Sequence, residues 1–382
     1  MNIGIFSECY KPTMNGVVVS IETFRKELIK RGHKVFIFAP KAKIKNYHDE
    51  NPYVFRVPSI ITPFKKDYPL GLPYFTEIPK ILPLMHLDII HLQHPQIMGR
   101  FGRKLAKKFK IPTVYTYHTL LVEYAHYFPI FKNLVKKYLI KVSKDFSNSV
   151  DQVITPSKTI KELLINYGVK TPIEVLPTGI TLKDYQNPYP EKIKKEYCIN
   201  PKNKVLIYVG RLAEEKNILF LLDAFQAIQK KYPKCHLLLV GGGENEKKYQ
   251  EKSKRLNLKN ITFTGQLPKE KTNQTFAVGD IFLMPSLTDT QGIVVVEAMA
   301  AGLPAVVMDK FGPSEIVEQG KSGFKIAPNN LDEFVEKTIL LLENDSLRFE
   351  MSKNARLRAK DFDSGKQTEK LIKLYERVIA KN

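Results

Sequence analysis

Short apolar runs alternate along the chain with longer segments whose apolar residues repeat at a helical period. The runs are predicted to form buried strands, and the segments between them are predicted to form helices. This alternation predicts an α/β protein with parallel sheets. The predicted strands span residues 2–6, 34–39, 54–57, 89–92, 113–116 and 152–155, and then 204–209, 236–240, 261–264, 281–284 and 305–307.

The alternation is interrupted between residues 175 and 190, and this interruption ends with the proline-rich sequence Asn187-Pro-Tyr-Pro190. A chain of 382 residues with 43% hydrophobic residues is long enough for two domains, each with its own core. We therefore predict two doubly wound domains over residues 1–177 and 178–365. Two such sheets that face each other leave a crevice at the carboxyl ends of their strands, where ligands bind.

Composition argues against several other classes of protein. The cysteines Cys9, Cys198 and Cys235 are scattered and form no Cys-x-x-Cys pair, so neither a disulfide framework nor a structural zinc site is supported. No apolar run approaches the roughly 18 residues of a membrane span. Residues 1–6 enter the first predicted strand without the pattern of a signal peptide. We expect a cytoplasmic protein.

The richest pattern of candidate binding residues follows the apolar run 280–285. A glycine-bearing turn leads there into a predicted helix over 294–301, and Asp289 and Glu297 lie on either side of that turn. The helix start would point backbone N–H groups at an anion such as a diphosphate, while Glu297 could accept from ribose hydroxyls and Asp289 could reach a sugar. These N–H groups belong to Gln291, Gly292 and Ile293. The alternative is a helix cap with an unrelated Glu.

A second strand-to-helix turn supplies two cations. The predicted strand 204–209 is followed by Gly210, Arg211 and Lys216. An Arg can hold a diphosphate through two parallel hydrogen bonds, and a Lys adds a second positive charge. The alternative is two solvated surface charges, but the presence of Asp289 and Glu297 in a similar turn favours a diphosphate site.

Together these motifs resemble those of the family-4 retaining glycosyltransferases, which have the GT-B fold of two facing Rossmann-like domains. The resemblance extends over nearly the whole chain. It rests on Arg211 with Lys216, on the span from Asp289 to Glu297, and on the glycine motifs Asn15-Gly16, Gly241-Gly-Gly243 and Phe263-Thr-Gly265. The sequence Thr288-Asp-Thr-Gln-Gly292 looks most like the branch that glucosylates diacylglycerol.

The resemblance implies a role for each of these residues. Arg211 and Lys216 would contact the donor diphosphate, and Glu297 would bind the ribose. Asp289 stands where the family usually has Glu, and Thr290-Gln291 replaces a Gly-Phe pair. The implied catalytic residues are His118, Arg211, Lys216 and Asp289. The implied donor-binding residues are Asn15, Gly16, Gly210, Arg211, Lys216, Gly265, Thr290, Gln291, Gly292, Ile293 and Glu297. A C-terminal helix over 366–382 would cross back onto the first domain.

Two further features lie at ends of predicted strands in the first half. The loop 7–16 contains a glycine, and most strand-to-helix junctions have a glycine for packing alone. The resemblance implies that this loop closes over the donor. His118 follows the strand 113–116, where a lone histidine is often structural, whereas the family has a Thr-x-His that lines the donor-sugar and acceptor site. His91 and His94 flank another strand end. Nothing acidic completes a metal-ligand set with them, so we interpret them as lining of the crevice.

Positive charge is concentrated in the first half of the chain. Residues 1–177 carry 27 Lys and Arg against 13 Asp and Glu, and the rest carries 33 against 26. Two basic helices are predicted over 99–110 and 130–146, and the second places apolar residues opposite its lysines. The basic residues of this surface are Arg100, Arg103, Lys104, Lys107, Lys108, Lys132, Lys136, Lys137 and Lys141.

Such a surface has three interpretations. It can be a solvated helix face, it can bind nucleic acid, as a pI of about 9.6 would allow, or it can dock on anionic lipid. Near a membrane each basic residue contributes about 1 kcal/mol. The crevice motifs indicate an enzyme that uses a sugar nucleotide, and a basic acceptor domain in such an enzyme favours an acceptor taken from a membrane. The aromatic, proline-rich loop 60–75 would add an apolar insertion point.

The resemblance, together with the basic surface, implies a retaining glucosyltransferase that moves glucose from UDP-glucose to 1,2-diacylglycerol at the inner face of the cell membrane. Expected partners are the sugar nucleotide, the diacylglycerol acceptor and an anionic membrane surface, without nucleic acid. We expect no prosthetic group and no metal ligands; magnesium is left open. The alternatives are a mannosyl- or galactosyltransferase acting on a phosphatidylinositol-like lipid or a soluble sugar and, outside enzymes, a basic nucleic-acid-binding protein.

Overall fold

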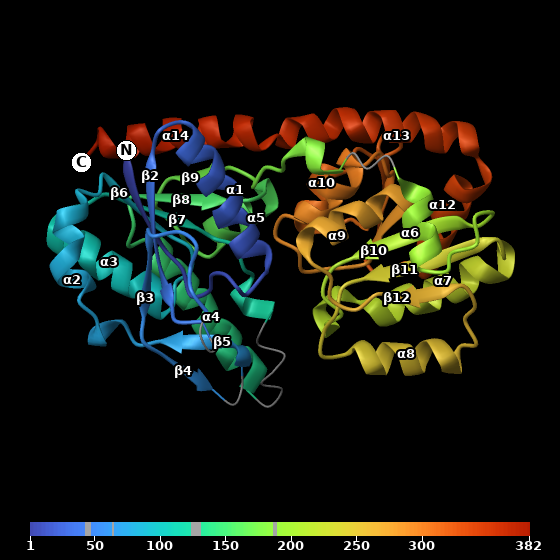
Figure 1. Cartoon of the computed structure of the whole chain (residues 1–382), viewed down its shortest axis with the longest axis horizontal. Coiled ribbons are helices and arrows are strands. Elements are labelled where there is room, and N and C mark those ends of the chain that lie inside the picture. Colours follow the sequence, from blue (N-terminus) through green and yellow to red (C-terminus); the bar gives the residue numbers. More distant parts are fainter. Residues whose placement is uncertain (43–46, 63–64, 124–130, 186–188) are drawn as a thin grey trace. The chain divides into compact units, whose positions relative to one another are not determined.

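The computed structural model describes residues 1–42, 47–62, 65–123, 131–185 and 189–382 (Figure 1). The chain divides into two compact units. Unit 1 comprises Met1–Gly179 together with Ser364–Asn382, and unit 2 comprises Ile180–Asp363.

Unit 1 contains a seven-stranded sheet in which every pairing is parallel and the strand order is β3-β2-β1-β6-β7-β8-β9. Its strands are mostly apolar because helices cover both faces of such a sheet. The strands are β1 (Asn2–Phe6), β2 (Lys34–Pro40), β3 (Val54–Val57), β6 (Ile89–Leu92), β7 (Thr113–Thr116), β8 (Gln152–Thr155) and β9 (Ile173–Val175). The helices are α1 (Gly16–Lys30), α2 (Ile78–Ile81), α3 (Ile97–Phe109), α4 (Lys132–Ser147), α5 (Lys158–Asn166) and α14 (Ser364–Ile379).

The helix α14 completes unit 1 although it follows unit 2 in the chain. Its apolar side chains Leu371, Leu374 and Tyr375 are buried in the same core as β1 and α1. The hydroxyl of Tyr375 is 2.6 Å from Nδ1 of His91, which lies on β6. The two ends of the described chain therefore share one hydrophobic core.

The segment 60–75 was expected to be a loop, and this expectation is wrong. It contributes to an antiparallel hairpin of β4 (Ser59–Thr62) and β5 (Lys65–Gly71), followed by a short 3₁₀ helix at Pro73–Phe75. Pro58 and Pro73 at its flanks and Pro69 within β5 obscured this hairpin in the sequence, because proline is usually found at edge strands and strand ends. Phe75 remains 75% exposed.

Unit 2 has a six-stranded parallel sheet with the order β12-β11-β10-β13-β14-β15. The strands are β10 (Lys204–Val209), β11 (Cys235–Val240), β12 (Ile261–Phe263), β13 (Ile281–Met284), β14 (Ala305–Met308) and β15 (Gly323–Ile326). The helices are α6 (Pro190–Glu196), α7 (Ile218–Lys231), α8 (Glu246–Arg255), α9 (Lys269–Thr275), α10 (Ile293–Ala300), α11 (Phe311–Ile316), α12 (Leu331–Glu343) and α13 (Asp345–Ala359).

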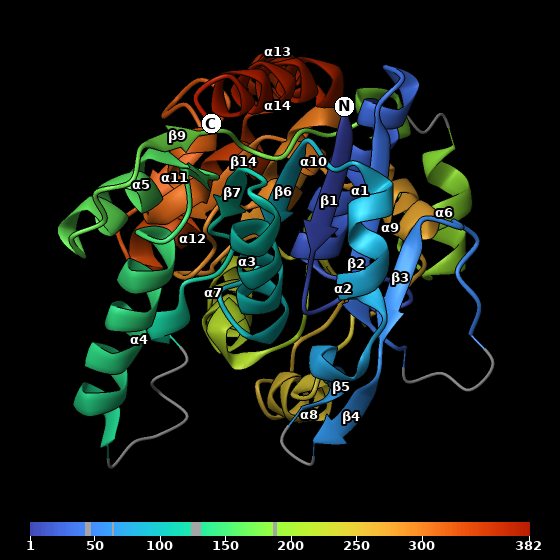
Figure 2. The same ribbon diagram turned by 90° about the vertical axis from the view of Figure 1, so that its left-hand side faces the viewer.

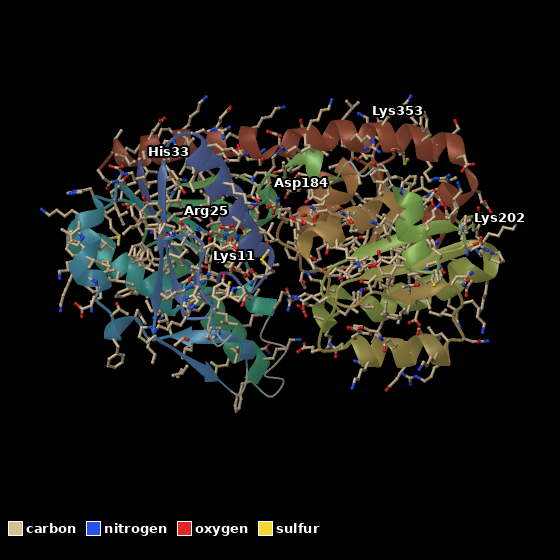
Figure 3. All side chains as sticks on the ribbon, viewed as in Figure 1. Lys11, Arg25, His33, Asp184, Lys202 and Lys353 are labelled. Atoms are coloured by element: carbon tan, nitrogen blue, oxygen red, sulfur yellow. The ribbon has the colours of Figure 1, made fainter. Side chains whose placement is uncertain are left out.

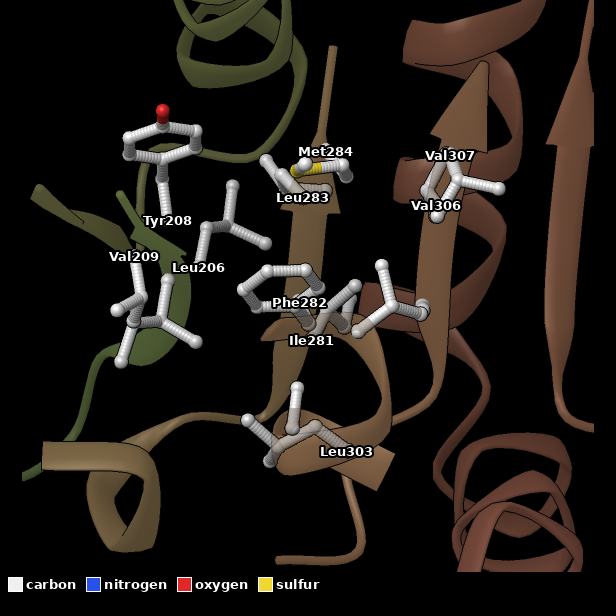
Figure 4. Close-up of a cluster of buried hydrophobic side chains, with 14 of the residues drawn as sticks. Leu206, Tyr208, Val209, Ile281, Phe282, Leu283, Met284, Leu303, Val306 and Val307 are labelled. Carbon is white, nitrogen blue, oxygen red and sulfur yellow. The ribbon is translucent and has the colours of Figure 1, made fainter. Parts of the chain in front are cut away.

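The core of unit 2 lies between this sheet and its helices. Leu206, Phe282 and Val306 come from three neighbouring strands and pack together in Figure 4. Charged side chains lie outside this core, and Lys202 and Lys353 extend into solvent (Figure 3). The predicted strands are confirmed, with ends that differ by a single residue in places. Apart from the β4–β5 pair, two short strands were not predicted, β9 and β15, and each lies at the edge of its sheet.

The strand orders fix where each unit can bind a ligand. In each sheet the chain reverses its direction of winding once, between β1 and β6 in unit 1 and between β10 and β13 in unit 2. Loops on either side of such a reversal point diverge and leave room at the carboxyl ends of the strands. The loops after β10 and β13 contain the acidic and basic motifs of the sequence analysis.

Candidate active site

The two loops at the reversal point of unit 2 are tied to each other by hydrogen bonds. The hydroxyl groups of Ser286 and Thr288 donate to the carbonyl of Glu215 at 3.4 and 3.3 Å. The side-chain amide of Asn217 donates to the carbonyl of Pro285 at 3.2 Å. These bonds join the segment after β10 to the segment after β13, so their charged side chains are held in one place.

The central contact of the site is an ion pair between Lys216 and Asp289. Lys216 Nζ lies 2.7 Å from Asp289 Oδ1, and both side chains are largely buried. Burial would raise the pKa of Asp289, but the charge of Lys216 and its hydrogen bond bring that pKa below its ordinary value. Asp289 is therefore ionised. Its second oxygen, Oδ2, is buried and has no hydrogen-bond partner among the described residues.

Arg211 lies at the rim of the same site. Its side chain is 55% exposed, and Nη2 is 2.6 Å from Glu215 Oε1. Its backbone carbonyl accepts a hydrogen bond from the Tyr208 hydroxyl at 3.1 Å. The guanidinium is thus held beside Glu215 at the surface of the site, and the backbone of Arg211 is fixed by the end of β10.

The helix α10 begins beside this ion pair. Gly292 precedes its first residue with a φ of 75°, a left-handed conformation that glycine adopts without strain. The backbone of Gln291 and Gly292 packs against Gly312 and Pro313 of α11. Thr290 and Gln291 belong to the turn that leads into α10. The amides of Gln291, Gly292 and Ile293 thus lie at a helix N-terminus, where the helix dipole favours negative charge.

Glu297 lies one turn farther along α10 and is 4% exposed. Its Oε1 accepts a hydrogen bond from the hydroxyl of Tyr185 at 2.8 Å and another from Lys269 Nζ. Sequence reasoning missed both partners. They lie 112 and 28 residues from Glu297 along the chain, so no local pattern could have linked them to it.

The glycine motifs bring three backbone segments of unit 2 together. Gly241 and Gly265 form a β-bridge. A side chain at Gly241 would bring its Cβ within 2.1 Å of the carbonyl oxygen of Gly210, so only glycine allows this approach. The backbones of Gly210, Gly241 and Gly265 therefore lie side by side, just past the ends of their strands.

Asn15 and Gly16 belong to unit 1 and open the helix α1. Asn15 is the N-cap of α1, and its side-chain oxygen accepts from the backbone N–H of Val18 at 3.0 Å. The side-chain amide of Asn15 donates to Cys9 Sγ at 3.3 Å. Apart from its chain neighbours and its own helix, no atom of the described residues lies within 4 Å of the place where Gly16 would have a Cβ, so this glycine leaves open space at the helix start.

His118 also belongs to unit 1 and follows β7. Its Nε2 lies 2.7 Å from Gln93 Oε1, a carbonyl oxygen, so that nitrogen carries the hydrogen. Burial, together with His94 and His91, holds the pKa of His118 well below its ordinary value. The imidazole is therefore neutral. His94 follows β6, and its Nδ1 accepts from the backbone N–H of Glu8 at 3.2 Å.

His91 does not line a crevice, and that interpretation of the sequence is wrong. It is 4% exposed, and its two nitrogens contact the hydroxyls of Tyr375 and Thr116 at 2.6 and 2.7 Å. Burial lowers its pKa to about 3, so it is a neutral link between β6, β7 and α14. The described residues contain no group of three or more His, Cys, Asp or Glu side chains arranged to hold a metal ion.

The basic residues of unit 1 lie on two helices with different surroundings. The helix α3 buries its apolar face, and its basic residues Arg100, Lys104, Lys107 and Lys108 are exposed, with Arg103 half-buried. In α4 only the C-terminal end is buried, where Phe146 packs edge-on against Tyr115. The first turns of α4 reach well beyond the strands of its sheet (Figure 2).

These first turns expose apolar and basic side chains together. Phe131, Leu134 and Tyr138 are 62%, 68% and 62% exposed. Four lysines of the same helix, Lys132, Lys136, Lys137 and Lys141, are also exposed. A surface that presents large apolar side chains among lysines is unusual for a solvated helix and typical of one that meets a partner. Across the described ranges, none of the helices is both long and apolar enough to cross a bilayer.

Both halves of the chain match known families. Residues 14–184 match the family described as Glycosyltransferase Family 4, and residues 190–358 match Glycosyl transferases group 1. The chain is 31% identical to the alpha-monoglucosyldiacylglycerol synthase of Acholeplasma laidlawii, over 100% of this chain and 98% of that protein. It is 33% identical to the synthase of the same description from Streptococcus pneumoniae, over 80% and 70%. A GDP-mannose-dependent alpha-mannosyltransferase of Corynebacterium glutamicum is 25% identical, over 100% and 90%.

Solved structures show the same fold. The sucrose-phosphate synthase of Thermosynechococcus elongatus superposes with a TM-score of 0.80 at 19% identity, over 100% of both chains. The Anabaena protein HepE, in complex with UDP-glucose, superposes with a TM-score of 0.78 at 19% identity, over 99% and 100%. The predicted GT-B fold with two Rossmann-like domains is thereby confirmed.

Proposed function

This chain belongs to glycosyltransferase family 4, and we propose that it transfers glucose from UDP-glucose to the free hydroxyl of 1,2-diacylglycerol with retention of the anomeric configuration. The likeness to two alpha-monoglucosyldiacylglycerol synthases supports the sugar and the acceptor. The likeness to a structure that holds UDP-glucose supports the donor.

The observation that carries this proposal is the buried, unpartnered Oδ2 of Asp289. A buried polar atom without a partner is costly, so such an atom at the carboxyl ends of the strands is a candidate contact for a ligand. An ionised carboxylate oxygen accepts hydrogen bonds, and a sugar hydroxyl is a suitable donor. We assign Oδ2 to a hydroxyl of the transferred glucose.

The remaining donor-binding residues are assigned to the diphosphate and the nucleoside. Negative charge develops on the diphosphate as the sugar leaves, and groups already oriented toward that charge lower the barrier. Lys216, Arg211 and the amides of Gln291–Ile293 would supply that stabilisation. Glu297 would accept from the ribose hydroxyls, and the backbone at Gly210, Gly241 and Gly265 would approach the nucleotide closely.

Unit 1 supplies residues for the acceptor side of the reaction. His118 is neutral, so it can share a hydrogen bond with a hydroxyl without adding charge. Asn15 and Gly16 would close over the donor. The exposed apolar and basic residues at the start of α4 support docking on an anionic membrane, with α3 adding positive charge, so we propose a peripheral protein at the cytoplasmic face.

A mannosyl- or galactosyltransferase is the second candidate, and the likeness to a GDP-mannose-dependent alpha-mannosyltransferase favours it. Purified protein should be offered UDP-glucose, UDP-galactose and GDP-mannose, each with diacylglycerol, phosphatidylinositol or a soluble sugar. We expect transfer of glucose to diacylglycerol in an α linkage. Transfer of mannose from GDP-mannose instead would replace the proposed donor, and transfer to the soluble sugar alone would replace the proposed acceptor.

The two acids of the donor site should differ in what they bind. Glu297→Gln should weaken the binding of UDP itself, because Glu297 is assigned to the ribose. Asp289→Asn should weaken UDP-glucose but leave UDP nearly unchanged, because Asp289 is assigned to the sugar. Calorimetric titration of both variants with both ligands tests this. Equal losses of UDP affinity would mean that the two roles are wrong.

A further inference from the structure

Two side chains outside the sequence motifs hold the carboxylate of Glu297. We propose that Tyr185 and Lys269 are positioning residues that fix Glu297 so that its second oxygen, Oε2, meets the ribose hydroxyls of the nucleotide. The inference rests on the proposed function, because it takes Glu297 as the ribose-binding acid. It adds two residues to the donor site.

The contacts divide the two oxygens of the carboxylate between protein and ligand. The Tyr185 hydroxyl donates to Oε1 at 2.8 Å, and Lys269 Nζ donates to the same oxygen. Neither contact uses Oε2. Two donors on one oxygen fix the rotation of the carboxylate, so the direction in which Oε2 accepts is set before a nucleotide arrives.

The charges of the three groups are matched. Glu297 is 4% exposed, and a carboxylate buried to that extent requires a countercharge and hydrogen bonds. Lys269 supplies the countercharge, and its Nζ also lies 5.7 Å from the centre of the Tyr185 ring. Burial and the adjacent Glu297 raise the pKa of Tyr185, so its hydroxyl remains protonated and able to donate.

The place of Lys269 in its helix is unfavourable unless the contact with Glu297 compensates for it. Lys269 is the first residue of α9, where the helix dipole disfavours a positive charge. Two residues along the same helix, Lys271 forms a surface ion pair with Glu196 at 2.5 Å. Lys271 therefore offers a matched control for the loss of a lysine from α9.

The ring of Tyr185 is held by packing as well as by its hydroxyl. It is 5% exposed and meets the ring of Phe276 edge-on, with 5.9 Å between ring centres. Tyr185→Phe therefore removes one hydrogen bond to Glu297 and keeps the packed ring.

The experiment compares UDP with 2′,3′-dideoxy-UDP, which lacks the ribose hydroxyls. Binding of both is measured by calorimetry for the unmodified protein, Lys269→Met, Tyr185→Phe and Lys271→Met. We expect Lys269→Met to lower the affinity for UDP about tenfold or more, and Tyr185→Phe to lower it less. The tenfold scale is that of losing one hydrogen bond to a charged group. Both variants should bind dideoxy-UDP like the unmodified protein, and Lys271→Met should change neither ligand.

The outcomes separate this inference from the proposed function. If Lys269→Met and Tyr185→Phe weaken both ligands equally, their role is structural and the inference is overturned. UDP affinities that do not change in either variant overturn it as well, while the proposed function stands. If the unmodified protein does not bind UDP, the proposed function and the inference both fail.

Discussion

Lys216→Ala and Arg211→Ala should each lower the turnover of glucose transfer about a hundredfold or more. The scale is that of removing one preorganised charge stabiliser, on the order of 10²–10³ in kcat. We expect the larger loss for Lys216, because its Nζ lies 2.7 Å from Asp289, whereas Arg211 is 55% exposed. Removing Lys216 also leaves a buried carboxylate without its countercharge. Initial rates with saturating diacylglycerol measure the effect.

A second lysine–aspartate pair of unit 2 provides the control. Lys252 lies 2.8 Å from Asp223 on the helices α8 and α7, and neither residue is among the assigned donor residues. Lys252→Ala removes the same kind of charge and should leave turnover unchanged. Thermal unfolding of each variant shows whether the protein stays folded. Near-normal kcat/KM in both Lys216→Ala and Arg211→Ala would refute the assignment of these residues to the diphosphate.

Reversing the charge of Lys132, Lys136, Lys137 and Lys141 to Glu should abolish co-sedimentation with anionic vesicles. These lysines are exposed beside the apolar side chains of Phe131, Leu134 and Tyr138 at the start of α4. Attraction between exposed charges is screened beyond about 8 Å at physiological ionic strength, so binding of the unmodified protein should weaken with salt. Binding of UDP, measured by calorimetry on the same variant, should remain intact.

The control for this variant reverses four exposed lysines of unit 2: Lys230, Lys231, Lys247 and Lys248. It changes the net charge of the protein by the same amount and should retain co-sedimentation. Loss of binding in both variants would point to net charge alone rather than to α4. If the unmodified protein ignores anionic vesicles even at low salt, a soluble sugar acceptor becomes the better proposal.

The architecture could be predicted from the sequence because parallel strands that are buried on both faces leave a strong signal. The runs 281–284 and 305–307, for example, contain apolar residues alone and form strands at those places. Edge strands leave a weaker signal. The edge strand β15 begins at Gly323, and β9 has three residues, so neither resembles a buried run. The β4–β5 hairpin was obscured by its prolines.

The candidate site could be predicted only where its residues are neighbours in the chain. Asp289 and Glu297 lie on one turn and the helix that follows, and their spacing identified them. The contact between Lys216 and Asp289 joins residues 73 positions apart, and the contact between Tyr185 and Glu297 joins residues 112 apart. Both contacts depend on how segments that follow separate strands pack against each other. The periodicity of a single segment cannot predict such a contact.

The membership of α14 in unit 1 has a consequence for how the protein is made. The helix is synthesised after the whole of unit 2, so the positions of Leu371, Leu374 and Tyr375 in the core of unit 1 stay unfilled until then. Domains usually fold in the order in which they leave the ribosome. Here the order should be reversed, with the later unit complete first. In a chain truncated after Asp363, a protease should digest unit 1 and spare unit 2.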